Sequence, residues 1–193
     1  GGHAIHSFLS HNLELTGFKE YPTEIAEVAS MAMELFSMDK WDVFFDNADE
    51  LKRAKEQQLE RVITIFPWIA TIDKFQHWIY ENPAHTEEER AGKWIEILNE
   101  FSSPIVDVQG LDEYRHYGWQ RQLHLYEVPF YYIEYGIAQL GAIGLWQQYK
   151  QNPANAVNNY ITALSLGGTR TLPELFKAAG LDFNLSPGYI KGL

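Results

Sequence analysis

Along this chain, apolar and polar residues follow helical rather than alternating spacing. Valine and isoleucine lack the period of two that marks a strand, and no segment reads as one. Residues 47–80 read as a long helix, densely charged at first and mostly apolar later, with Pro67 expected to kink or divide it. The pattern predicts an all-α protein with few or no strands.

Local start and stop signals bound the remaining expected helices. These are residues 2–10, 23–36, 86–101, 130–151, 153–166 and 172–179. Thr86 and Glu89 have the spacing of a capping box, and Gly180 is a helix-stop signal. Residues 105–118 are expected to be irregular or to form a short helix, and residues 119–126 to be helical.

Composition and charge restrict the class of protein. The chain has 193 residues, of which 46% are hydrophobic, which is enough for one domain with a core and argues against disorder. A net charge of −11 makes nucleic acid and anionic membrane surfaces poor partners. No apolar run approaches the roughly 18 residues needed to span a bilayer. Cysteine is absent, which fits a cytoplasmic location and means that any metal must bind to His, Asp or Glu.

Two acidic residues interrupt an otherwise apolar helix. Residues 25–36 are apolar nearly all round, which predicts burial, yet Glu27 and Glu34 lie seven positions apart within them. At about 100° per residue the two carboxylates differ by about 20°, so they share one face, two turns apart. Buried carboxylates need cations, hydrogen-bond donors or a metal ion. Salt bridges to lysine or arginine are the simpler alternative.

Two histidines lie close to the start of the chain, which reads Gly-Gly-His. In the helical zinc motif His-Glu-x-x-His, the histidines bind the metal and Glu is the general base. If His and Glu preceded Gly1, His3 would complete this motif, although a lone histidine is more often structural. His6 is a competing ligand, but it would lie about 10 Å along the helix from the first histidine. We therefore interpret His6 as a neighbour of the site.

These features resemble the oligoendopeptidase F branch of the thimet oligopeptidase family. In that family, a His-Glu-x-x-His helix is followed some two dozen residues later by Glu-x-x-Ser-x-x-x-Glu. Residues 27–34 have this second pattern, and it begins 24 residues after His3. The resemblance implies that His3 and Glu27 bind Zn²⁺ and that Glu34 orients a zinc-bound imidazole. Two His, one Glu and an open position for water suit a catalytic zinc site.

A second group of polar aromatic residues lies between positions 124 and 136. In the family, a histidine followed by a tyrosine-rich helix start stabilises the oxyanion and grips the substrate backbone. The resemblance implies catalytic roles for His124, Tyr132 and Tyr135, and substrate binding by Tyr131. The spacing from His124 is one residue shorter than in the thimet branch, so either Tyr131 or Tyr132 could face the metal. Packing aromatics with hydrogen-bonded hydroxyls are the alternative.

The resemblance extends to the end of the chain. Residues 167–181 resemble a Gly-Gly…Pro…Glu-Leu…Ala-Gly stretch near the family's C-terminus. Residues 1–193 are thus expected to form the C-terminal part of one helical, zincin-like catalytic domain, together with the N-terminal remainder of the same enzyme. The implied activity is zinc-dependent endopeptidase hydrolysis of short peptides. Because the first His and the Glu base are expected upstream of Gly1, the isolated chain is expected to be inactive.

Two other functions account for part of the pattern. A di-iron helical bundle needs two Glu-x-x-His motifs on separate helices, and Glu113 with His116 is the one pair with that spacing. A non-catalytic helical binding or scaffold domain would make the charged stretches ordinary solvated helix faces. Metal content distinguishes these alternatives, since a di-iron protein would hold iron and a scaffold no metal.

Overall fold

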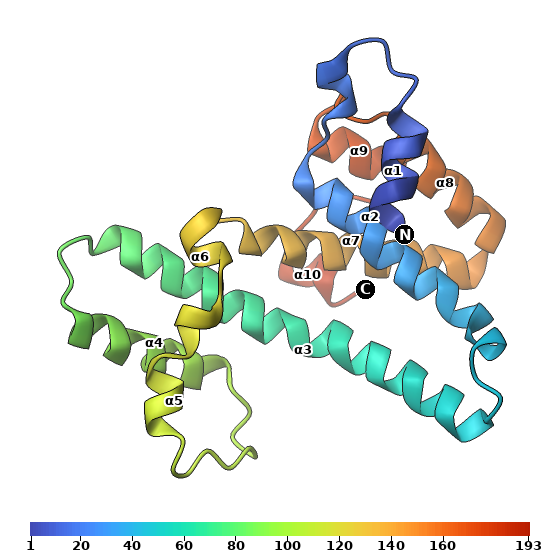
Figure 1. Cartoon of the computed structure of the whole chain (residues 1–193). Helices are drawn as coiled ribbons and strands as arrows, with labels where there is room; N and C mark the ends of the chain where they lie inside the picture. The colour runs from blue at the N-terminus through green and yellow to red at the C-terminus, as the bar shows by residue number, and fades with distance from the viewer. The chain divides into compact units, whose positions relative to one another are not determined.

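The computed structural model describes residues 1–193 and consists of ten α-helices, three short 3₁₀ helices and no strand. This confirms the all-α prediction. The chain divides into two compact units, residues 1–58 with 137–193 and residues 59–136. The division falls within the two longest helices, α3 (Ala48–Glu81) and α7 (Tyr132–Gln151) (Figure 1).

The first unit is a cluster of helices around α2 (Thr23–Ser37). Helix α1 (Gly2–Ser10) packs on α2 and on α8 (Pro153–Ser165), while α9 (Leu172–Ala178) packs on α8 and α2 (Figure 1). The short elements η1 (Thr16–Lys19), η2 (Met38–Val43) and α10 (Pro187–Ile190) complete the unit. Its fully buried apolar side chains include Ile25, Val28, Ala29, Ala32, Leu35, Leu145, Leu164 and Leu175. Most of these belong to α2, as its apolar composition predicts.

Small residues allow the helices of this unit to approach closely. A Cβ on Gly141 of α7 would lie 2.9 Å from a Val28 methyl carbon and 3.1 Å from the Phe176 ring. The hydroxyl of Tyr160, on α8, donates a hydrogen bond of 2.8 Å to the carbonyl oxygen of Ala29. Because a buried hydroxyl without a partner is costly, this bond fixes the position of α8 on α2.

Two glycines in the loop after α8, Gly167 and Gly168, pack against η1. The amide of Gly168 donates to the carbonyl of Phe18 at 2.8 Å, and a Cβ on Gly168 would lie 1.9 Å from the carbonyl oxygen of Glu20. Gly167 has a φ of +51°, which favours glycine. These glycines serve backbone packing.

The second unit packs α4 (Glu87–Phe101) against the later part of α3. It also contains α5 (Asp112–His116), η3 (Gly118–Arg121) and α6 (His124–Glu127). Its core is strongly aromatic and consists of Ile69, Ile72, Phe75, Trp94, Ile97, Trp119 and Tyr132. The indole N–H of Trp94 donates to the carbonyl of Arg115 at 2.8 Å, which satisfies the polar atom of a buried ring.

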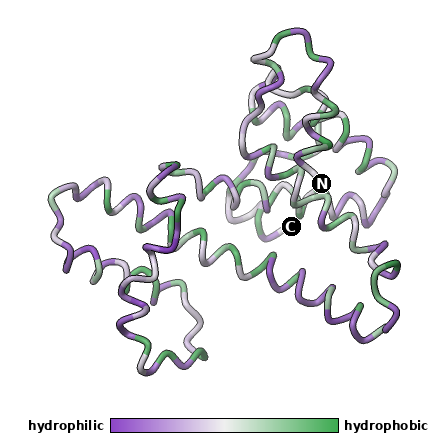
Figure 2. The backbone as a smooth tube through the Cα atoms, viewed as in Figure 1, coloured by the Kyte–Doolittle hydropathy of each residue, from purple (hydrophilic) through white to green (hydrophobic).

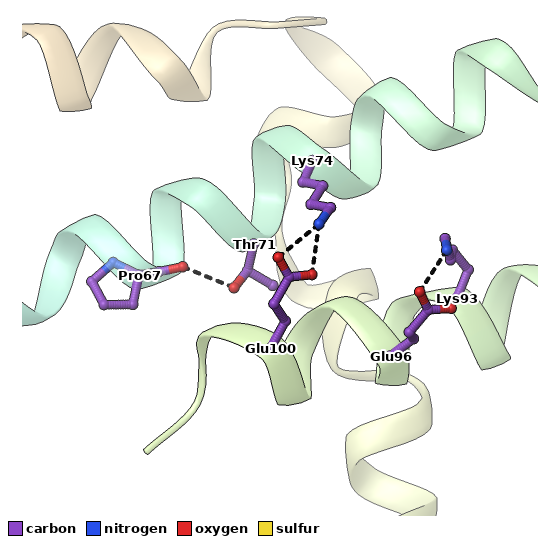
Figure 3. Close-up of polar contacts among 6 residues, drawn as sticks. All are labelled: Pro67, Thr71, Lys74, Lys93, Glu96 and Glu100. Carbon is purple, nitrogen blue, oxygen red and sulfur yellow. Dashed lines mark hydrogen bonds and ion pairs between the residues drawn. The ribbon is translucent and has the colours of Figure 1, made fainter. Parts of the chain in front are cut away.

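Helix α3 is continuous, so of the two effects expected of Pro67, a kink or a division, the division does not occur. Pro67 has no N–H to donate to the carbonyl of Ile63, but Ile63 is 70% exposed, so water can hydrate that carbonyl. One turn later, the hydroxyl of Thr71 donates to the carbonyl of Pro67 at 2.8 Å (Figure 3). An ion pair of 2.6 Å between Lys74 and Glu100 joins α3 to α4 in the same view.

Most predicted boundaries agree with the structure within one or two residues. The capping box of Thr86 and Glu89 is present at the start of α4, and the charged first part of α3 stands out as a hydrophilic stretch (Figure 2). Residues 119–126 form parts of two short helices rather than one. Helix α7 begins at Tyr132 rather than at 130, because Phe130 has a φ of +60°. The backbone N–H of Phe130 donates to Oε1 of the buried Gln76 side chain at 3.0 Å.

None of the helices combines the length and the apolar character that a bilayer crossing requires.

Candidate metal centre and oxyanion-binding residues

The imidazole of His3 and the carboxylate of Glu27 face each other in the first unit. Nε2 of His3 lies 3.5 Å from Oε2 of Glu27, although the two residues belong to different helices, α1 and α2. The His3 side chain is 55% exposed and the Glu27 side chain 14%. A partly exposed imidazole beside a largely buried carboxylate has the chemistry of a metal-binding pair.

Close backbone packing brings this pair together. Gly2 immediately precedes His3, and a Cβ on Gly2 would lie 2.2 Å from the carbonyl oxygen of Ala29 on α2. Since any side chain at position 2 would force the helices apart, glycine is required there for His3 to reach Glu27.

The carboxylate of Glu27 is oriented by Ser30, the serine of the Glu-x-x-Ser pattern. The Ser30 hydroxyl lies 3.2 Å from Oε2 of Glu27 and 3.0 Å from its carbonyl oxygen, and it donates to both. A hydrogen-bonded carboxylate of this kind presents its remaining lone pairs in a defined direction, as metal ligands commonly require.

His6, a residue of α1, is fully buried and stacks on Tyr21, with ring centroids 3.4 Å apart. Neither ring nitrogen has a hydrogen-bond partner. Burial, and secondarily the charge of nearby His3, lower the pKa of His6 from 6.5 to about 4. His6 is therefore a neutral packing residue beside the site at ordinary pH.

Glu34 is exposed, so the expectation that it would be buried with Glu27 is wrong. Its carboxylate accepts a hydrogen bond of 3.1 Å from the side-chain amide of Gln58, at the α2 end of helix α3. Glu34 lies on the same face of α2 as Glu27 but two turns further along the helix. At that position its surroundings are solvent and the first part of α3 rather than the core.

No group of three or more His, Asp and Glu side chains in the chain comes together as a metal site. His3 and Glu27 nevertheless fit zinc by ligand type, since imidazole and carboxylate are two of its three common protein ligands. Two such ligands provide part of a coordination shell.

In the second unit, His124 lies at the centre of a hydrogen-bonded group. Its Nδ1 lies 2.6 Å from the amide nitrogen of Gln122, and its Nε2 lies 3.2 Å from the hydroxyl of Tyr135. The amide oxygen of Gln122 in turn accepts from the indole N–H of Trp68 at 3.3 Å. Sequence reasoning missed Gln122 and Trp68, and only the proximity of Gln122 to His124 in the sequence could have suggested a contact.

Three tyrosines surround the His124 ring, and they are the three that were named from the sequence as candidate site residues. The ring centroid of His124 lies 5.6 Å from that of Tyr131, 5.1 Å from Tyr132 and 5.7 Å from Tyr135. Tyr131 and Tyr135 are half-buried, whereas Tyr132 is 9% exposed and belongs to the aromatic core. Burial raises the pKa of Tyr132, partly offset by a hydrogen bond with Trp68 and the charge of Arg121. This environment favours a packing role for Tyr132.

Comparison with known proteins places these residues in a family. All of residues 1–193 match peptidase family M3. The chain is 25% identical over 187 residues to an oligoendopeptidase F homolog from Borreliella burgdorferi, which covers 94% of this chain and 31% of that protein. It is also similar to the solved structure of PZ peptidase A with an inhibitor, with 32% identity and a TM-score of 0.91 over 99% of this chain and 34% of that one.

The chain thus spans about a third of the length of these relatives. The match to the family nevertheless includes every residue present, among them His3, Glu27 and His124. On this match over its whole length, the chain belongs to peptidase family M3.

Proposed function

We propose that this chain is part of a zinc-dependent endopeptidase that cleaves short peptides. The observation that carries the proposal is the approach of His3 Nε2 to Glu27 Oε2, at 3.5 Å, in a chain of peptidase family M3.

His3 and Glu27 would hold the zinc ion, with Ser30 fixing the direction of the Glu27 carboxylate. A bound zinc ion would supply activated water and a polarised peptide carbonyl. A further His and a Glu base, expected from the family resemblance, would come from the part of the enzyme that this chain does not include. The imidazole of His3 must remain neutral to act as a ligand, so affinity should fall in acid.

The His124 group would serve the oxyanion of the tetrahedral intermediate. The half-buried hydroxyl of Tyr135 lies 3.2 Å from Nε2 of His124, a contact that holds it in position as a candidate donor. Donors of this kind contribute about 10²–10³ in kcat when they are aimed at the developing charge. Tyr131 would contact the substrate backbone, and Tyr132 would hold the group in place from the aromatic core.

The remaining parts of the proposal rest on the family resemblance. Short peptides are the proposed substrates, the rest of the same enzyme is the partner of this chain, and the cytoplasm is the proposed location. Because His3 and Glu27 supply two ligands, we expect the 193-residue chain alone to bind zinc more weakly than the intact enzyme and to leave peptides uncleaved.

The test compares His3→Ala and Glu27→Gln with Glu24→Gln in the intact enzyme. Glu24→Gln makes the same chemical change on the same helix, three residues earlier. We expect the first two variants to lose bound zinc, measured by mass spectrometry of the metal, together with hydrolysis of a quenched fluorescent peptide. The control should keep both. Full zinc content in His3→Ala and Glu27→Gln would contradict the proposed site, and an intact enzyme without any metal would favour a non-catalytic binding or scaffold domain.

A further inference from the structure

Four side chains of residues 59–136 form one continuous run of hydrogen bonds. Trp68 Nε1 lies 3.3 Å from Gln122 Oε1, Gln122 Nε2 lies 2.6 Å from His124 Nδ1, and His124 Nε2 lies 3.2 Å from the Tyr135 hydroxyl. The four residues come from α3, the turn after η3, α6 and α7. The run therefore joins the buried core to the half-buried end of the predicted site.

The chemistry of Trp68 sets the direction of every bond in this run. An indole N–H can only donate, and the N–H of Trp68 is shared between the Tyr132 hydroxyl and the Gln122 amide, so the oxygen of that amide faces Trp68. The NH₂ group of Gln122 then faces His124, and Nδ1 of that ring must accept. A neutral imidazole with an unprotonated Nδ1 carries its proton on Nε2, which lies beside Tyr135.

The bond to Tyr135 follows the same direction. Nε2–H of His124 donates to the oxygen of the Tyr135 hydroxyl, so the hydroxyl proton of Tyr135 cannot point back at His124. Hydrogen bonds in one direction polarise one another, which makes the O–H of Tyr135 a better donor.

We infer that Gln122, held by Trp68, is a positioning residue that fixes His124 as its Nε2–H tautomer and directs the Tyr135 hydroxyl proton away from His124. The catalytic part of this inference rests on the proposed function, in which that proton meets the oxyanion. The tautomer itself does not depend on the proposed function.

Packing around Trp68 and His124 limits other arrangements. The Trp68 ring meets buried Trp94 edge to face at 5.9 Å, and the guanidinium of Arg121 lies over it at 5.1 Å. The His124 ring meets Tyr132 and Tyr135 at near-perpendicular angles of 78°. A ring packed in this way cannot easily flip about its Cβ–Cγ bond, which would exchange Nδ1 with Cδ2 and Nε2 with Cε1.

The test measures the side-chain ¹⁵N shifts of His124 by long-range ¹H–¹⁵N correlation in the 193-residue protein. Three variants are compared with it: Gln122→Glu, Trp68→Phe and Gln120→Glu. A carboxylate at position 122 can only accept and should move the imidazole proton to Nδ1. Trp68→Phe removes the donor that orients Gln122 while keeping a ring. Gln120→Glu is the matched control, since it adds the same charge two residues away at an exposed position.

We expect an Nε2–H tautomer in the wild type and in Gln120→Glu, an Nδ1–H pattern in Gln122→Glu, and a mixture of tautomers in Trp68→Phe. In the intact enzyme, Gln122→Glu should lower kcat about 10²-fold with little change in KM, and Gln120→Glu should not. A wild-type Nδ1–H tautomer, or identical shifts in Gln122→Glu and Gln120→Glu, would overturn the inference. Loss of the proposed function would instead appear as an intact enzyme that hydrolyses no peptide while the His124 shifts still follow the expected pattern.

Discussion

The α-carbon of Gly2 lies so close to Ala29 that a Cβ on Gly2 would come within 2.2 Å of the Ala29 carbonyl oxygen. The same carbonyl accepts a hydrogen bond from Tyr160 at 2.8 Å. One peptide group of α2 thus contacts both α1 and α8. The position of His3 relative to Glu27 depends on this contact, because His3 is the next residue along α1.

Substitution of Gly2 by alanine should separate α1 from α2. Overpacking of this kind typically costs about 1–3 kcal/mol, even though alanine favours a helix over glycine by about 1 kcal/mol. We expect Gly2→Ala to lower the free energy of unfolding in urea and to weaken zinc binding by the intact enzyme at least about tenfold. Gly1→Ala is the control, since a Cβ there would meet no atom within 4 Å. Equal zinc affinity in both variants would show that the approach of α1 to α2 does not position His3.

Removal of the Ser30 hydroxyl should weaken the proposed zinc site without abolishing it. Ser30 donates to Oε2 of Glu27 at 3.2 Å, so it would act on the zinc ion through that ligand. Groups that orient a metal ligand typically contribute about 10–100-fold in affinity or activity. We expect Ser30→Ala to raise the dissociation constant for zinc by about tenfold in competition with a chelator. Ser37→Ala is a matched control, since its hydroxyl likewise donates to a carbonyl of α2, that of Glu34. The role given to Ser30 is refuted if the two variants bind zinc alike.

The burial of His6 should make the protein less stable in mild acid. Its pKa is about 4 in the folded protein and 6.5 as an ordinary histidine, so the unfolded chain binds the additional proton first. As pH falls from 6.5 towards 4, the free energy of unfolding should drop, by up to about 3 kcal/mol, and the loss from this group should level off below 4. The measurement is urea unfolding, followed by circular dichroism at each pH, with a chelator present.

The His6→Phe variant tests the cause of this acid sensitivity. Phenylalanine can stack on Tyr21 as His6 does, but it has no proton to bind. Its stability should change less between pH 6.5 and 4 than that of the wild type. His11→Phe, at an exposed histidine one turn later in the chain, should retain the wild-type slope. A wild-type slope in His6→Phe would assign the acid sensitivity to other groups.

The helices could be predicted from the sequence because their signals are local. The capping box at Thr86 and the stop at Gly180 depend on neighbouring residues alone, and both are present. Local sequence could not decide between a kink and a division at Pro67, since the cost of the proline depends on whether Ile63 is exposed, which is a property of the tertiary structure. The late start of α7 likewise depends on a hydrogen bond from Phe130 to Gln76, 54 residues away in the sequence.

Some features of the candidate site could likewise be predicted from the sequence, whereas others depend on tertiary contacts. The family resemblance implied that His3 and Glu27 are ligands, and the structure brings their side chains to 3.5 Å. Periodicity also suggested burial for Glu34, but two residues on one helix face can meet different surroundings two turns apart. The contact of Gln122 with Trp68 joins residues 54 positions apart, so no local pattern contains it.

The tyrosines near His124 allow a last prediction, because they differ in burial. Tyr135 accepts a hydrogen bond from His124, whereas Tyr132 is 9% exposed and lies in the aromatic core with Phe75 and Trp94. In the intact enzyme, Tyr135→Phe should lower kcat by about 10²–10³, as expected for loss of an oxyanion donor. Tyr132→Phe should instead cost about 1 kcal/mol of folding free energy and leave kcat within a few-fold of the wild type, since the ring that packs is retained. Steady-state kinetics and urea unfolding of both variants separate the two effects. If Tyr132→Phe lost as much activity as Tyr135→Phe while remaining stable, Tyr132 would be the catalytic phenol that the sequence predicted, and its burial would have to be relieved when substrate binds.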